Sequence, residues 1–173
     1  VIIGAGEFQI QLIEKAKELG YETHVFAWEE GAVGKEISDY FYPISIVEKE
    51  LILDKCKDIK PECVVSIGSD LAVLTVNYIS RELGLNANPE EVDLIATNKY
   101  EMRKAFQKAN VEIPKFVKTN QVSEKIYSEL KKFRFPLIVK PTDRSGSRGI
   151  RKVNSLEEVD EAVHAAVKES FEK

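Results

Sequence analysis

Short apolar runs alternate with amphipathic segments in the first part of the chain. The apolar runs lie at residues 1–3, 23–27, 40–44 and 63–67, and we expect each of them to be a strand. Between them, apolar residues recur at helical spacing, as they do at residues 47–59. This alternation predicts an α/β fold with an open parallel sheet and right-handed crossovers. Runs without polar alternation are typical of strands that are buried on both faces.

The pattern changes after Pro89. Further helices are expected at 89–95, from 97 onward, at 123–133 and at 155–171, and strands at 115–118, 135–140 and 149–153, the last two as a β-hairpin. Thr97 is the expected cap of the second of these helices, and Ser155 with Glu158 forms a capping box for the last one. We therefore divide the chain into an α/β domain (1–96), a linker helix (97–112) and a partial α+β lid subdomain (113–173).

Composition narrows the class of protein. The chain has 173 residues and a formal net charge of -4, and no basic stripe offsets that acidity, so we expect no nucleic-acid partner. No apolar run reaches the roughly 18 residues that a membrane span needs. Cys56 and Cys63 are too few for a disulfide framework or a metal cluster, and we expect free thiols of a cytoplasmic protein. The chain opens inside a strand at Val1, without a signal peptide, so we expect a trimmed start.

The hairpin tip carries the most specific motif. Lys140 is expected to end its first strand on the buried side, and the loop that follows contains Ser145, Gly146, Ser147, Arg148 and Gly149. Small residues let backbone N–H groups approach a ligand, while Lys140 supplies a point charge and Arg144 and Arg148 add donors for phosphate. A solvated surface turn has a similar composition, so the loop by itself does not decide between the two interpretations. It is not a Walker A loop, because a strand follows it and the Gly-Lys-Ser/Thr ending is missing.

The order of these elements resembles the ATP-grasp superfamily, which includes biotin carboxylase, carbamoyl-phosphate synthase and carboxylate–amine ligases. An α/β domain, called the pre-ATP-grasp domain in that family, precedes a helix beginning Asn98-Lys99, and the sequence Pro136-Leu-Ile-Val-Lys140-Pro141 leads into the Gly-rich hairpin. The resemblance implies that Lys99 and Lys140 contact the phosphates of ATP. It also implies that residues 145–149 form a flexible lid over them.

The same resemblance implies a reaction. The γ-phosphoryl group of ATP passes to a small carboxylate, and an amine or another nucleophile then displaces phosphate from the acyl phosphate. The family's adenine hinge and Mg²⁺ ligands are expected beyond this chain. We therefore expect the N-terminal part of a ligase, inactive alone, and assign no catalytic or metal-binding residue within it. The oligomeric state stays open, with a homodimer as the first candidate because dimers are the commonest assembly.

The turn Gly4-Ala5-Gly6-Glu7 leaves other functions open. It follows a strand and opens a helix, but Gln9 replaces the third Gly of a dinucleotide fingerprint, which predicts looser helix–strand packing. With Glu29 or Glu30 as a ribose-binding acid, an NAD(P)-linked oxidoreductase is one alternative, and a non-catalytic nucleotide-binding module is another.

In ATP-grasp relatives this turn faces the acceptor substrate, which makes Glu7 a candidate substrate-binding residue. Ser69 and Asp70 follow the expected strand at 63–67 and either touch substrate or cap the next helix. His24 and His164 have no partner that suggests catalysis, and we expect structural roles for both.

Overall fold

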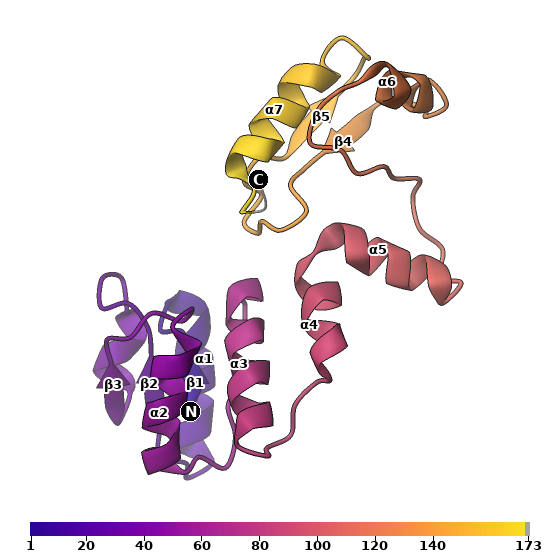
Figure 1. Ribbon diagram of the computed structural model, residues 1–173. Helices are drawn as coiled ribbons and strands as arrows, with labels where there is room; N and C mark the ends of the chain where they lie inside the picture. Colours follow the sequence, from indigo (N-terminus) through magenta and orange to yellow (C-terminus); the bar gives the residue numbers. More distant parts are fainter. Residues whose placement is uncertain (172–173) are drawn as a thin grey trace. The chain divides into compact units, whose positions relative to one another are not determined.

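The computed structural model describes residues 1–171, and the chain forms two compact units, Val1–Ala96 and Thr97–Lys173 (Figure 1). Each unit has buried apolar residues of its own. The first contains a parallel sheet and the second an antiparallel hairpin covered by helices.

The first unit is built on a sheet of three parallel strands in the order β1 (Ile2–Ile3), β2 (His24–Phe26) and β3 (Tyr40–Tyr42). The helices that alternate with them are α1 (Glu7–Glu18), the 3₁₀ helix η1 (Val33–Ile37), α2 (Lys49–Ile59) and α3 (Asp70–Glu82). The expected parallel α/β fold is confirmed.

Side chains of successive strand residues enter opposite layers. Ile3 and Phe26 pack with buried residues of α2 and α3, such as Ile52 and Ile79. Ile2 and Val25, one position earlier in each strand, pack with residues of α1 such as Ile13. Helices therefore cover both faces of the sheet, which is why its strands are apolar throughout (Figure 1).

The expected strand at 63–67 is wrong in its extent, because only Val65 bridges to Ile2. Ile3 donates its N–H to the Val65 carbonyl at 2.9 Å, as in a parallel ladder. The next bond does not form, since the Ser66 hydroxyl donates to the Ile3 carbonyl in its place. A side chain has thus taken the acceptor that would have continued the strand.

Helix α4 (Glu90–Thr97) is tied to α3 inside the first unit. Arg81 contacts Asp93 at 2.6 Å, and the Asn77 side-chain amide donates to the same carboxylate at 2.6 Å. Burial acts against ionisation of Asp93, but its bonds to Arg81 and Asn77 outweigh burial and lower the pKa of its carboxyl group. The start of α4 is therefore held by a charge-assisted network.

The second unit contains α5 (Lys99–Lys108), α6 (Glu124–Leu130), β4 (Leu137–Val139), β5 (Arg151–Val153) and α7 (Val159–Glu169). Strands β4 and β5 pair antiparallel, with Leu137 opposite Val153, so the predicted hairpin is confirmed. Its inner face packs on α6 and α7 through Leu130, Val159 and Val163.

Three expectations for this unit are wrong. Residues 115–118 form no strand, and the β4–β5 sheet, as far as the structure describes it, has no third strand that they could join. Asn98, not Thr97, caps α5, because its Oδ1 accepts from the N–H groups of Tyr100 and Glu101 at 3.0 and 3.2 Å. Helix α7 begins later than residue 155, since the Glu158 carboxylate accepts from the Asn154 N–H at 3.0 Å, ahead of the helix.

Candidate functional site

The loop after β4 has a tight, exposed tip. Gly146, Ser147 and Gly149 have positive φ angles of 66°, 59° and 66°, a conformation that glycine adopts freely and serine rarely. Residues 145–148 are exposed. The tip of the loop is therefore accessible to a ligand.

The base of the same loop is fixed against the end of α7. A Cβ atom on Gly149 would lie 2.9 Å from Pro141 Cγ and 3.0 Å from Glu169 Cβ, so only glycine fits there. The Ser170 hydroxyl donates to the Asp143 carboxylate at 2.9 Å. The loop thus combines a packed base with an exposed tip.

Arg144 adds to this anchor rather than to the tip. Its guanidinium lies 4.1 Å from the centre of the Phe171 ring and 3.5 Å from the Glu169 carboxylate. The Arg144 side chain is largely buried by these contacts, and its Nε has no hydrogen-bond partner among the described residues. Of the two arginines in the loop, Arg148 is therefore the one available to a ligand.

Lys99 joins the first turn of α5 to this loop. Its backbone N–H donates to the Thr142 carbonyl at 2.7 Å, and its side-chain ammonium donates to the Arg144 carbonyl. An ammonium has three donors, so the Lys99 side chain can hold the loop and bind an anion at the same time. Two lysines that lie 41 positions apart in the sequence (140 − 99) are thereby brought to one loop.

The sequence pattern predicted Lys140 on the buried side of its strand. This prediction is wrong, because the Lys140 residue is exposed. Partial burial, followed by the positive charges of Arg103 and Lys99, lowers the pKa of the Lys140 ammonium. The two lysines predicted as ATP-binding therefore lie in one electrostatic neighbourhood, and Arg103 is a third cation that the sequence did not single out. The available signal was its spacing, four residues after Lys99 on the same helix.

A second residue that sequence reasoning missed is Ile138. Leu137 and Val139 point into the core, whereas Ile138 lies opposite Lys152 on the other face of the hairpin and is 59% exposed. The period of two in a strand places Lys140 on that same outer face. An apolar surface thus lies beside the cation cluster, and the exposed isoleucine in the strand pattern was the signal for it.

In the first unit, Glu7 and Asp70 lie at the carboxyl-end edge of the sheet. Glu7 is the first residue of α1 and Asp70 the first of α3, and both are exposed. The two turns are adjacent, because a Cβ atom on Gly68 would lie 3.1 Å from Phe8 Cβ. Ser69 is the cap of α3, accepting from the Ala72 N–H at 3.3 Å. The edge therefore offers two carboxylates to a ligand, and the Ser69 hydroxyl, which accepts a bond at the cap, can still donate its own hydrogen.

Gln9 does not loosen the packing of α1, contrary to the expectation. Its side chain is buried, its Oε1 accepts from the Gly6 N–H at 2.9 Å, and its Nε2 donates to the Ile67 carbonyl. The amide thereby occupies the donor at the start of the helix that a dinucleotide pyrophosphate would use. Of the two candidate ribose-binding acids, Glu29 and Glu30, Glu29 is paired with Lys35 at 2.7 Å.

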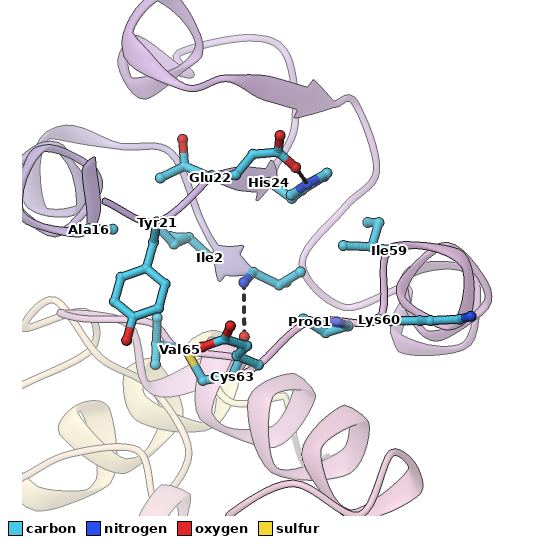
Figure 2. A pocket seen from close by; sticks show the side chains of 13 residues that line it. Ile2, Ala16, Tyr21, Glu22, His24, Ile59, Lys60, Pro61, Cys63 and Val65 are labelled. Carbon is cyan, nitrogen blue, oxygen red and sulfur yellow. Dashed lines mark hydrogen bonds and ion pairs between the residues drawn. The ribbon is translucent and has the colours of Figure 1, made fainter. Parts of the chain in front are cut away.

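A hollow of about 260 Å³ lies at the opposite edge of the same sheet, and Figure 2 shows the side chains that line it. Its lining includes Val1 and Thr23, which precede β1 and β2, and the Val1 amino group donates to the Cys63 carbonyl at 2.9 Å. It therefore lies at the amino ends of the strands, away from Glu7 and Asp70. Ligand sites of open α/β sheets lie at the carboxyl ends, so this hollow is not our candidate site.

The remaining polar candidates have structural roles or none. His24 stacks on Tyr40 with ring centres 4.6 Å apart and contacts the Tyr42 hydroxyl at 2.9 Å, while His164 is an exposed residue of α7. Cys56 is buried, which raises the pKa of its thiol to about 11, and Cys63 is exposed. Within residues 1–171, no three His, Cys, Asp or Glu side chains gather as metal ligands, and no helix has the length and apolar character of a membrane span.

A parallel α/β unit is followed by a unit in which a capped helix and a Gly-rich hairpin bring cations together, an arrangement suited to a phosphate-bearing ligand. Comparison with known proteins agrees. The family model described as D-ala D-ala ligase C-terminus matches residues 96–172. Residues 96–172 are thus similar to a ligase domain, in agreement with the resemblance of the chain to the ATP-grasp superfamily of ligases.

Individual relatives cover nearly the whole chain. It is 28% identical to the formate-dependent phosphoribosylglycinamide formyltransferase of Prochlorococcus marinus (strain CCMP1986 / NIES-2087 / MED4) over 98% of this chain and 44% of that relative. It is 26% identical to the phosphoribosylglycinamide synthetase structure from Anaerococcus prevotii, with a TM-score of 0.67 over 91% of this chain and 39% of that one. The chain therefore spans less than half the length of these relatives.

A third comparison concerns the fold alone. The biotin carboxylase domain of 2-oxoglutarate carboxylase from Hydrogenobacter thermophilus is 21% identical, with a TM-score of 0.74 over 97% of this chain and 41% of that one. That protein was crystallised as a dimer in complex with MgADP, ADP and bicarbonate.

Proposed function

We propose that this chain is the amino-terminal part of an ATP-dependent ligase that activates a small carboxylate as an acyl phosphate and passes the acyl group to an amine. The observation that carries the proposal is the meeting of Lys99, Lys140 and the exposed loop tip in one unit. Cations beside free backbone N–H groups favour a polyphosphate ligand.

In this proposal the second unit binds ATP. The ammonium groups of Lys99 and Lys140 contact phosphate oxygens. Residues 145–148 (Ser145, Gly146, Ser147 and Arg148) close over them with backbone N–H groups, hydroxyls and the Arg148 guanidinium, from a base that Gly149 fixes. The exposed Ile138 side chain gives the adenine an apolar surface. These groups neutralise the charge that shifts during phosphoryl transfer, which is the main task of catalysis in this type of reaction.

The proposed reaction consists of two successive displacements. A carboxylate oxygen attacks the γ-phosphorus, the bond to the β,γ-bridging oxygen breaks, and ADP leaves. The amine then attacks the acyl carbon, the carbon–oxygen bond to phosphate breaks, and the amine loses one proton. The formate-dependent relative supports this substrate class, since formate is a small carboxylate.

We place the acceptor amine at the carboxyl-end edge of the first unit. Glu7 and Asp70 are exposed carboxylates there, and a carboxylate is a suitable partner for an ammonium group before it is deprotonated. In this proposal Ser69 orients the turn as a helix cap. A Mg²⁺ ion that accompanied ATP would neutralise part of the phosphate charge, and we propose that its carboxylate ligands lie outside this chain, since Lys99, Lys140 and Arg148 are cations that suit phosphate and not metal.

The test uses the full-length protein with ATP, Mg²⁺ and a panel of small carboxylates and amines. Wild-type protein should release phosphate only when both a carboxylate and an amine are present, and Lys140→Ala should lose most of that turnover. Unchanged turnover in Lys140→Ala would refute the assignment. Binding of ATP without turnover under any pairing would instead indicate a non-catalytic nucleotide-binding module. The NAD(P)-linked alternative is not supported, because Gln9 occupies the Gly6 N–H and the family model that matches residues 96–172 is that of a ligase.

A further inference from the structure

Helix α5 carries two cations on one face. Lys99 and Arg103 are four residues apart in that helix, so their side chains leave the same side of it. The Lys99 end of this face is fixed toward the loop after β4 by the bonds to Thr142 and Arg144. Arg103 therefore lies one helical turn further along the side of α5 that faces the loop.

Arg103 differs from its neighbours in having no acidic partner. Lys104, the next residue, pairs with Glu101 at 2.9 Å, whereas the half-buried Arg103 has no hydrogen bond or ion pair with any residue from 1 to 171. The Arg103 guanidinium therefore keeps all its donors available to an anion.

Arg103 also lies near two other cations, which makes the lack of an acidic partner among the described residues more significant. Three effects lower the pKa of the Lys140 ammonium. Partial burial is the largest, and the positive charges of Arg103 and of Lys99 follow. Three cations thus repel one another across a single site, and no carboxylate of the described residues pairs with Arg103 to relieve that repulsion. A polyphosphate has the charge and the number of oxygen acceptors to do so.

We propose that Arg103 is a third phosphate-binding cation, which together with Lys99 and Lys140 surrounds the polyphosphate of the nucleotide. This inference rests on the proposed function, because it assumes that the site takes ATP. Arg103 adds a planar fork of N–H donors that fits two phosphate oxygens together, whereas each lysine contributes a point charge. Arg103 therefore fixes the orientation of a phosphate group as well as its charge.

The experiment measures ATP affinity of the full-length protein by calorimetry for the wild type, Arg103→Gln, Arg103→Lys, Lys140→Ala and Lys104→Gln. Loss of a charge-assisted contact predicts roughly 10- to 100-fold weaker binding for Arg103→Gln. Arg103→Lys should recover part of the loss, since it restores the charge and not the fork. Lys104→Gln, on the same helix but paired with Glu101, should stay within about twofold of wild type.

A second readout separates binding from general damage. Removing the Arg103 charge should raise the pKa of Lys140, so an amine-reactive reagent should label Lys140 more slowly at a fixed pH in Arg103→Gln, whereas a loosened fold would speed labelling. Wild-type ATP affinity in Arg103→Gln, alongside weakened binding in Lys140→Ala, would overturn this inference and leave the proposed function standing. Absence of ATP binding by the wild type would overturn both.

Discussion

Lys99 and Thr142 are joined by a backbone hydrogen bond of 2.7 Å, from the N–H of one to the carbonyl of the other. Through this bond the start of α5 and the loop after β4 act as one piece. The Lys99 ammonium strengthens the link by donating to the Arg144 carbonyl. One lysine therefore shapes the loop with its backbone and its side chain together.

Replacing this lysine should affect the loop before any ligand is added. Lys99→Gln removes the ammonium that holds the Arg144 carbonyl, so amide hydrogen exchange of residues 142–148 should be faster in the free protein. ATP affinity should also fall by roughly 10- to 100-fold. Lys108→Gln, at the exposed end of α5, is the control and should change neither quantity. Unchanged exchange in Lys99→Gln would contradict the role in positioning the loop.

Two glycines of the loop provide a matched pair for stability. Gly146 and Gly149 share a φ of 66°, so alanine is strained at both, but only at Gly149 would the new Cβ lie 2.9 Å from Pro141. We expect Gly149→Ala to lower the free energy of unfolding by about 2–4 kcal/mol and Gly146→Ala by about 1 kcal/mol. Urea denaturation followed by circular dichroism measures the difference, and equal losses would show that the base of the loop is not packed as described.

Ile138 tests where the base of the nucleotide lies. Because the Ile138 side chain is 59% exposed, Ile138→Ala should change the free energy of unfolding by less than about 1 kcal/mol. Loss of the apolar contact with adenine should weaken the binding of ATP by about threefold to tenfold, while the affinity for inorganic tripolyphosphate stays constant. Competition binding with the two ligands separates these effects. An equal loss for both would place the base elsewhere.

The buried amide of Gln9 should be important for the first unit. Gln9→Ala leaves the Gly6 N–H and the Ile67 carbonyl without their partner, which costs about 1–3 kcal/mol of unfolding free energy. Gln11→Ala changes an exposed residue of the same helix and should have little effect. Trp28, the single tryptophan of the chain, lies in this unit and its fluorescence reports the transition. Equal midpoints for the two variants would argue against the described bonds.

Asp39 predicts an acid-dependent loss of stability. The Thr23 N–H, followed by Lys17, holds the pKa of the Asp39 carboxyl at about 2, below its ordinary value of 3.8. A lowered folded-state pKa gives stability that is present above pH 3.8 and is lost as the pH falls toward 2. Because the side chain is 33% exposed, its contribution is about 1 kcal/mol after screening by solvent.

Asp39→Asn should therefore be less stable at neutral pH and show a flatter stability profile in the acid range. Asp58→Asn, an exposed carboxylate of α2, should keep the wild-type slope. Thermal unfolding at several pH values from 2 to 6 distinguishes the variants. A wild-type slope in Asp39→Asn would mean that the Thr23 and Lys17 contacts do not hold this carboxylate ionised.

Periodicity and composition were sufficient for the parallel sheet and for the hairpin, because both depend on which residues are apolar. They were insufficient where one side chain competes with the backbone. The Ser66 hydroxyl ends the pairing expected for 63–67, and Asn98 caps α5 instead of Thr97. From residue type alone, Gln9 only interrupts a glycine pattern, but its amide donates to the carbonyl of Ile67, far along the chain.

For the candidate site, the sequence predicted Lys99, Lys140 and the loop through resemblance to a family, whereas Arg103 and Ile138 emerged only from the structure. Arg103 belongs to the site because α5 is held against the loop by the backbone of Lys99. Ile138 belongs to it because the hairpin leaves one face uncovered. Neither fact can be read from residue type, since charged helix residues and strand isoleucines are common in any α/β protein.

The anchoring of the loop base to α7 limits what the loop can recognise. With Asp143, Arg144 and Gly149 held in place, only the four residues 145–148 remain to swing over a ligand. A segment of that length spans at most about 14 Å when fully extended, so it covers a triphosphate and not a nucleobase. Closure of this lid would therefore respond equally to ATP and GTP, and discrimination between purines would have to come from residues that surround the base.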